Sequence, residues 1–163
     1  MVDVRLNVPM VDQSGAKRTK SGSKALKNAC WYAAACMVSY YHRPGPRPGI
    51  PALWQADQGL PPEKIADLCA IEGLMPLDQP TVITPEWLAS VLTRSGPIWA
   101  AGHFLERPDQ PRIGHVIVIT GIQQRIVHYH DPEGPPPRTM LLGTLNAGRW
   151  TPDGLLVKDR RRY

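Results

Sequence analysis

The chain has 163 residues, a net charge of +5 from 19 basic and 14 acidic residues, and 18 prolines beside 14 glycines. This length is enough for a hydrophobic core, and we expect residues 1–163 to form a single domain with many turns. The basic residues gather at residues 17–27 and 158–162 without interleaved aromatic residues, which argues against nucleic-acid binding. No apolar run has the length needed to span a bilayer, so no membrane association is expected.

The N-terminus lacks the apolar segment of a secretory signal peptide. We therefore expect a soluble protein that is made in the cytoplasm without a Sec signal of its own. The three cysteines, Cys30, Cys36 and Cys69, are odd in number and include no Cys-x-x-Cys pair. This pattern disfavours a disulfide framework and a zinc site built from cysteines, and it favours one selected thiol. We expect neither a metal nor a cofactor.

The first part of the chain is predicted to be largely helical. Residues 4–10 alternate between apolar and polar, which predicts a short strand, and residues 16–27 are predicted to be a basic loop. Proline at the start and glycine past the end delimit the second helix, and Thr84 is the expected N-cap of the third. The three predicted helices span residues 30–41, 63–71 and 84–94.

After Gly96 and Pro97 the hydrophobic periodicity changes from helical to extended. The predicted strands span residues 98–104, 114–122, 125–130, 138–142 and 155–158. Helices followed by a run of antiparallel strands predict an α+β fold. In this fold an N-terminal helical half, with its central helix, packs on a C-terminal antiparallel sheet.

The central predicted helix opens on a cysteine, Cys30, and continues with small apolar residues. The unpaired amides of a helix's first turn favour an anion, so a thiol at this place is shifted toward the reactive thiolate. The same backbone N–H groups can bind an oxyanion. The alternative is a buried structural cysteine, because free cysteines are among the most buried residues.

A histidine and an aspartate stand at the ends of two neighbouring predicted strands. His115 is at the head of one strand, and Asp131, followed by a proline, is at the end of the next. If the two strands pair as a hairpin, both side chains come to the same end of the sheet. His115 then takes the thiol proton of Cys30, Asp131 orients the imidazole, and Gln13 donates its side-chain amide to the oxyanion.

Four ordered motifs resemble papain-like cysteine peptidases, in particular the compact bacterial effector peptidases and the bacteriocin-processing peptidases. The motifs are Val8-Pro9 with Gln13, Cys30-Trp31, His115-Val116-Ile117-Val118 and Asp131-Pro132. The resemblance implies a papain-like fold and amide hydrolysis through an acyl-enzyme. It also implies a catalytic triad of Cys30, His115 and Asp131, with an oxyanion hole from Gln13 and the Cys30 backbone.

The predicted function is that of a cysteine protease acting on a protein or peptide, with small residues, Gly-Gly in particular, before the cleaved bond. The resemblance further implies a secreted effector or toxin domain, delivered into a target cell by a secretion system and restrained by a cognate immunity protein. Two alternatives stay open. One is a peptidoglycan amidase or a peptidase that matures exported peptides. The other is a catalytically silent binding module, against which the retained Cys–His–Asp set argues.

Other candidate residues have simpler interpretations. Cys36 and Cys69 lie in predicted helix interiors and are interpreted as core residues. His103 is a rival general base, but no Asp-Pro ends the strand that follows it. His128 and His130 share one face of a predicted strand and suggest a metal pair. Because no third ligand stands at a useful spacing, we interpret them as histidines on the sheet surface.

Overall fold

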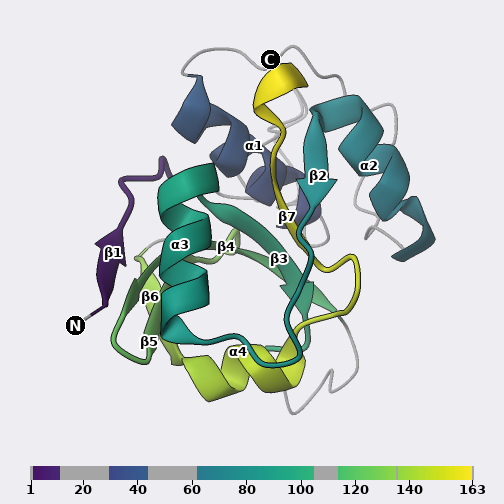
Figure 1. Cartoon of the computed structure of the whole chain (residues 1–163). Coiled ribbons are helices and arrows are strands. Elements are labelled where there is room, and N and C mark those ends of the chain that lie inside the picture. The colour runs from purple at the N-terminus through teal and green to yellow at the C-terminus, as the bar shows by residue number, and fades with distance from the viewer. Residues whose placement is uncertain (1, 12–29, 44–61, 105–113, 135, 163) are drawn as a thin grey trace.

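The computed structural model describes residues 2–11, 30–43, 62–104, 114–134 and 136–162. Within these ranges the chain forms four α-helices, two short 3-10 helices and one seven-stranded antiparallel sheet (Figure 1). The helices are α1 (Cys30–His42), η1 (Pro62–Lys64), α2 (Ile65–Glu72), α3 (Pro85–Ser95), α4 (Leu142–Gly148) and η2 (Arg160–Arg162). The strands are β1 (Asp3–Arg5), β2 (Leu74–Pro76), β3 (Ile98–Gly102), β4 (His115–Gln123), β5 (Ile126–His130), β6 (Arg138–Leu141) and β7 (Leu155–Lys158).

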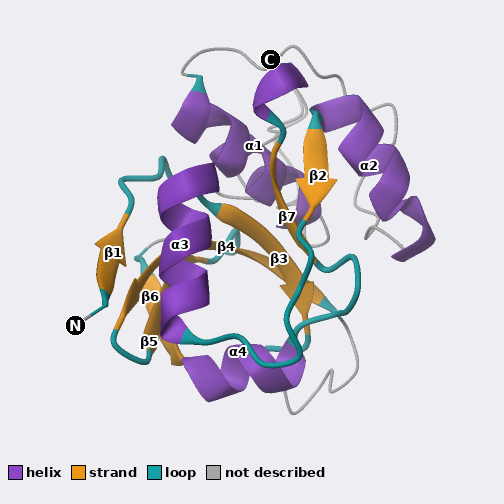
Figure 2. Ribbon diagram, viewed as in Figure 1, coloured by secondary structure: helices purple, strands orange, loops and turns teal. Residues whose placement is uncertain are grey.

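Strand β4 is the hub of the sheet (Figure 2). The strand order is β2-β7-β3-β4-β5-β6, and β1 pairs with the far end of β4. β4 and β5 form a hairpin with a two-residue connection, in which Gln124 has a φ of 55°. β4 pairs with β3 from His115 to Ile119 and with β5 from Val118 to Gln123, so β3 holds the start of β4 in the sheet.

The sheet separates two hydrophobic clusters. One face packs against α3 and α4, whose buried residues join alternate residues of β3, β4 and β7. The other face packs against α1 and α2, and Figure 1 shows these two helices on the far side of the sheet from α3. The alternation of β4 side chains between two buried faces explains its continuous run of β-branched residues.

Helix α1 packs on the sheet with three successive alanines among its buried residues. Ala33, Ala34 and Ala35 are completely buried, so the helix backbone approaches the strands closely. Its first turn is tied to β3 by a buried hydrogen bond, which the indole Nε1 of Trp99 donates to the carbonyl oxygen of Trp31 at 3.0 Å. The start of α1, with Cys30, is therefore fixed relative to the sheet.

The α+β fold and most predicted elements are confirmed. Helices α1, α2 and α3 and strands β3 to β7 lie within a few residues of their predicted positions. Thr84 caps α3 as predicted, because its hydroxyl accepts a hydrogen bond from the backbone N–H of Trp87 at 3.2 Å. The predicted basic loop at residues 16–27 lies outside the described residues.

One prediction of local structure was wrong, and two short elements were not predicted. The strand predicted over residues 4–10 is limited to β1, because only the last residues of β4 are available to pair with it. Strand β2 was missed, since its three residues are extended only through pairing with the distant β7. Helix α4 was also missed, because it has seven residues and no side-chain cap. The chain is therefore not divided cleanly into helices followed by strands.

Candidate active site

The β4–β5 hairpin brings His115 and Asp131 together. His115 is the first residue of β4, and Asp131 directly follows the last residue of β5. The two strands run antiparallel, with Val118 opposite His130, so both side chains lie at the same end of the sheet. The imidazole Nε2 of His115 lies 2.8 Å from Oδ1 of Asp131. Because an ionised carboxylate only accepts hydrogen bonds, Nε2 carries the proton in this contact.

Asp131 is completely buried and accepts hydrogen bonds on both oxygens. Besides His115, Oδ1 accepts from the backbone N–H of Glu133 at 2.9 Å. The other oxygen, Oδ2, accepts from Nη1 of Arg138 at 3.0 Å. A buried carboxylate without such partners would be costly to ionise, and these three donors offset that cost.

Cys30 approaches His115 from helix α1, which packs on one face of the sheet. It is the first residue of α1, it is partly buried, and its thiol forms no disulfide. Burial lowers the pKa of His115, but the hydrogen bonds and charges of Asp131 and Cys30 outweigh it and raise that pKa from 6.5 to about 9. Since Nε2 faces Asp131, the ring nitrogen left for Cys30 is Nδ1. A histidine held as a cation beside a buried carboxylate can stabilise a thiolate on its other side and later donate a proton.

Residues 5–147 match the family model described as papain-like cysteine protease AvrRpt2. The chain belongs to this family. It is therefore a papain-like cysteine peptidase, a hydrolase that acts on protein or peptide substrates. The resemblance drawn from four sequence motifs is confirmed at this level, and the matched span includes the positions of Cys30, His115 and Asp131.

The structure of the peptidase brings three of the four predicted site residues together. Cys30, His115 and Asp131 form one hydrogen-bonded series across α1, β4 and the end of β5. The fourth, Gln13, lies outside the described residues, so its place relative to Cys30 stays a prediction. The backbone of Cys30 is at the first turn of α1, where helix N–H groups have no partner within the helix.

Arg138 is the residue of this site that the sequence analysis did not find. The sequence predicts only that a strand starts at Arg138, and the structure pairs β6 with β5 so that Arg138 lies opposite Tyr129. Tyr129 is two residues before Asp131, and this register brings the guanidinium to the carboxylate. The signal was an arginine at the head of the strand after the Asp-Pro turn, and it becomes informative only when the β5–β6 register is known.

The rival general base, His103, has a different partner. It is exposed, and its Nδ1 accepts a hydrogen bond from the indole Nε1 of Trp150 at 3.2 Å. The same indole packs against Gly114, where an added Cβ would meet the ring at 2.2 Å. Trp150 thus fixes the residue that precedes His115 and engages His103 at the same time.

The remaining cysteines and histidines differ in part from their interpretations. Cys36 is buried as expected, while Cys69 is only partly buried. His130 is not a surface histidine, because it is 9% exposed and its Nε2 donates to the carbonyl oxygen of Val8 at 3.0 Å. It is buried because the segment that follows β1 covers it, which alternation within β5 does not reveal. Among the described residues, no group of three or more His, Cys, Asp or Glu side chains could hold a metal ion.

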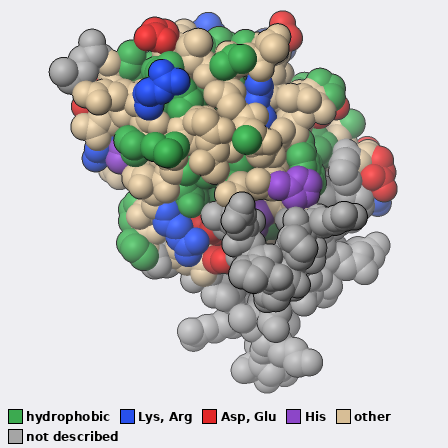
Figure 3. Space-filling model, turned by 90° about the horizontal axis from the view of Figure 1, so that it is seen from below, with side chains coloured by type: hydrophobic (Ala, Val, Ile, Leu, Met, Phe, Trp, Pro, Cys, Tyr) green, Lys and Arg blue, Asp and Glu red, His purple; other side chains and the backbone are tan. Residues whose placement is uncertain are grey.

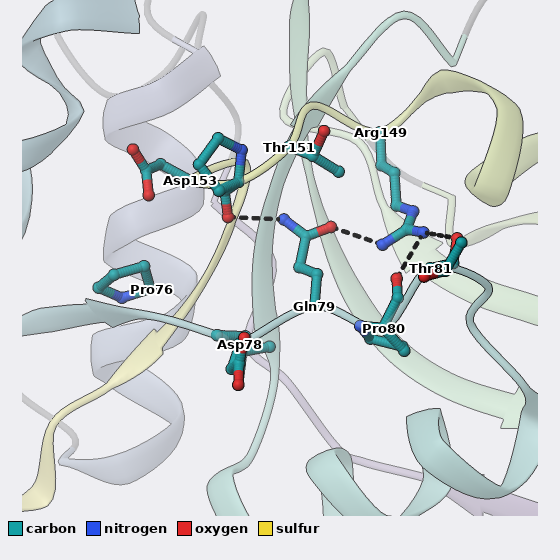
Figure 4. Close-up of a pocket in the computed structure, with 10 residues that line it drawn as sticks. Pro76, Asp78, Gln79, Pro80, Thr81, Arg149, Thr151 and Asp153 are labelled. Carbon is teal, nitrogen blue, oxygen red and sulfur yellow. Dashed lines mark hydrogen bonds between the residues drawn. The ribbon is translucent and has the colours of Figure 1, made fainter.

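A second polar region of the peptidase lies in a groove of about 600 Å³ between residues 76–81 and 149–153 (Figure 4). Arg149 donates to the side chain of Gln79 at 2.7 Å and to the carbonyl oxygens of Pro80 and Thr81 at 2.9 and 2.8 Å. Gln79 in turn donates to the carbonyl oxygen of Pro152 at 3.0 Å. The described lining residues include neither a cysteine nor a histidine, so this groove holds no nucleophile and base of the kind at Cys30.

The described surface is chemically mixed. On the face shown in Figure 3, basic side chains are scattered among hydrophobic and uncharged ones rather than gathered into one stripe, and histidine side chains lie near the middle. Among the described helices, none combines the length and the hydropathy that a bilayer crossing requires.

Proposed function

We propose that this peptidase cleaves peptide bonds with Cys30 as nucleophile, His115 as general base and acid, and Asp131 as the residue that orients the imidazole. The observation that carries the proposal is the series of contacts from Cys30 through His115 to Asp131, in which the carboxylate is fully buried. It supports the proposal because each group has a partner of the chemistry that its role requires.

The reaction follows from these roles. The Cys30 thiolate attacks the carbonyl carbon of the substrate, and the oxyanion that forms is stabilised by backbone N–H groups at the start of α1, with Gln13 as the second donor. The His115 imidazolium gives its proton to the leaving amine, which leaves a thioester on Cys30. Water then attacks the thioester while His115 takes its proton, and the thiolate is released.

The biological setting is proposed on the sequence resemblance to bacterial effector and bacteriocin-processing peptidases. The protein is delivered by a secretion system into a target cell, where it acts as a toxin in bacterial competition and a cognate immunity protein restrains it. Its substrates carry small residues, Gly-Gly in particular, before the cleaved bond. Such residues suit a narrow cleft, because they let the peptide backbone approach the nucleophile.

The experiment that tests the proposal compares protein termini across the proteome after expression of the wild type and of Cys30→Ala in bacteria. New termini that need Cys30, preceded by small residues, support the protease. Released peptidoglycan fragments without new termini would instead indicate an amidase. Neither product from a folded wild-type protein would indicate a silent binding module. New termini preceded by bulky residues would keep the protease and contradict the Gly-Gly preference.

A further inference from the structure

The carboxylate of Asp131 is shared between two cations that approach different oxygens. Oδ1 accepts from His115 on β4, and Oδ2 accepts from Arg138 on β6. Asp131 is completely buried, while the Arg138 side chain is 37% exposed, so the guanidinium closes the solvent side of the carboxylate. In the proposed reaction the charges alternate along the series, because a Cys30 thiolate, the imidazolium, the carboxylate and the guanidinium follow one another.

The second cation matters most when the imidazole is neutral. In the proposed reaction His115 gives its proton to the leaving amine, and Asp131 then faces an uncharged ring. An ionised carboxylate in a buried site is costly without an opposite charge nearby. Arg138 provides that charge at every stage, because a guanidinium does not lose its proton in proteins.

We propose that Arg138 is a positioning residue for catalysis, which keeps the buried Asp131 ionised and turned toward His115 throughout the reaction. This inference rests on the proposed roles of Cys30, His115 and Asp131. Arg138 acts through Asp131 and does not itself touch the reacting atoms. Its hydrogen bond to Oδ2 leaves Oδ1 for the imidazole, so the guanidinium fixes both the charge and the rotation of the carboxylate.

The groups around this carboxylate come from several elements. Cys30 comes from α1, His115 from β4 and Tyr129 from β5, and the backbone N–H of Glu133 in the turn after Asp131 donates to Oδ1. Burial and the charge of Asp131 raise the pKa of Tyr129, and the charge of Arg138 opposes that effect. The field of Arg138 therefore reaches groups beyond the carboxylate to which it is bonded.

Removal of the Arg138 charge favours the protonated forms of Cys30 and His115, because a positive charge nearby is lost. Loss of a nearby cation raises the pH at which the Cys30 thiolate forms and the pH at which the His115 imidazolium loses its proton. Because the Arg138 side chain is partly exposed and acts on Cys30 and His115 through Asp131, we expect each limb of the pH profile to move upward by roughly half to one pH unit. His115 is closer to Arg138 along the series than Cys30, so the basic limb moves more than the acidic limb.

The test measures the rate of alkylation of Cys30 by iodoacetate against pH, with mass mapping of the labelled residue. The carboxylate of iodoacetate is attracted by the imidazolium, so the profile has an acidic limb and a basic limb. The variants are Arg138→Gln and Arg138→Met, which remove the charge, and Arg138→Lys, which keeps it. Arg94→Met is the matched control, because Arg94 is an exposed arginine in the last turn of α3.

We expect both limbs to move upward in Arg138→Gln and Arg138→Met, and to stay in place in Arg138→Lys and Arg94→Met. Unshifted limbs in either folded neutral variant, or equal shifts in Arg94→Met, would overturn the role of Arg138 while leaving the proposed function intact. A wild-type profile without two limbs would contradict the proposed ion pair and the role of Arg138 together. Because alkylation needs no peptide substrate, these results do not depend on finding one.

Discussion

Two arginine-centred clusters hold distant segments of this peptidase together, but only one of them has the chemistry of a reaction. Arg138 bonds to a buried carboxylate that also accepts from His115. Arg149 bonds to an amide oxygen and to two backbone carbonyl oxygens, as Figure 4 shows for Gln79, Pro80 and Thr81. Its acceptors have no charge at any pH, so the Arg149 cluster fixes conformation without coupling to a proton.

The difference teaches that density of hydrogen bonds does not identify a site. Among the described residues, the Arg149 guanidinium donates three hydrogen bonds and that of Arg138 donates one, and the Arg149 cluster lies beside the groove between residues 76–81 and 149–153. The Arg138 cluster differs because it contains titratable groups that interact with one another. The hydrogen bonds and charges of Asp131 and Cys30 raise the pKa of His115. Groups with perturbed pKa values at a shared place are candidates for function.

The largest expected effect on activity comes from His115, which belongs to the Arg138 cluster. His115→Ala removes the proton acceptor and donor, and we expect kcat/KM to fall by about 10²–10⁴-fold, to the level of Cys30→Ala. Turnover of one peptide substrate at fixed pH measures this, with folding checked by circular dichroism. Wild-type turnover in a folded His115→Ala variant would move the general base elsewhere, and His103 would be the next residue to test.

A smaller loss is expected from the residue that orients the base. Asp131→Ala keeps the imidazole but loses its orientation and its counter-charge. In a serine-protease triad, the standard example, a change at this position costs about 10⁴ in turnover. A thiolate needs less help, so we expect roughly a 10- to 1000-fold loss here. Asp131→Asn is expected to fall between Asp131→Ala and wild type, because an amide oxygen still accepts from the ring.

Full activity in a folded Asp131→Ala variant would reduce the site to a Cys–His pair. Combining the changes at His115 and Asp131 sharpens the result. The double variant is expected to be little worse than His115→Ala, because residues that act as a unit are not additive. Independent, multiplying losses would show that Asp131 acts on something other than the imidazole.

The stability and activity of the Arg138 cluster are expected to depend on pH because the pKa of His115 is raised. Because its folded-state pKa is about 9 and the unfolded value is 6.5, the imidazolium persists through neutral pH. The stability that it contributes is fully present below about pH 6.5 and is lost as pH rises through about 9. We expect the basic limb of kcat/KM near pH 9, and a limb near pH 6.5 would contradict the ion pair.

The smallest effect on activity is expected at the second cluster. Arg149→Met leaves the Gln79 side chain and two carbonyl oxygens without their donor, so the free energy of unfolding should fall by about 1–3 kcal/mol. The pH limbs and kcat/KM of the folded variant are expected to match wild type. Urea unfolding measures the free energy, and a pH–rate profile measures the limbs. A shifted limb in Arg149→Met would contradict the claim that only the Arg138 cluster is coupled to proton transfer.

Much of this site could be predicted from the sequence because its signals are local. Cys30 opens a helix of small apolar residues, and His115 and Asp131 stand at the adjoining ends of two strands joined by a short turn. A hairpin fixes which strand ends meet, so the pairing of His115 with Asp131 follows from pattern alone. The α+β fold follows in the same way from the change of hydrophobic period.

The parts that could not be predicted depend on contacts between distant segments. Arg138 reaches Asp131 through the register of β6 on β5, and the buried imidazole of His130 donates to the carbonyl oxygen of the distant Val8. Strand β2 exists through its pairing with β7, more than seventy residues away in the sequence. In each case the local residues permit several structures, and the tertiary partner selects one of them.

The central claim is that Cys30 is a thiolate nucleophile made reactive by His115, and selective alkylation tests it most directly. The wild-type protein and His115→Ala are treated with iodoacetamide at neutral pH, and the labelling rate of each of the three cysteines is followed by peptide mass mapping. We predict that Cys30 reacts rapidly, that Cys36 and Cys69 react slowly, and that His115→Ala slows Cys30 alone. Equal labelling of Cys36 or Cys69, or an unchanged Cys30 rate in folded His115→Ala, would contradict the account.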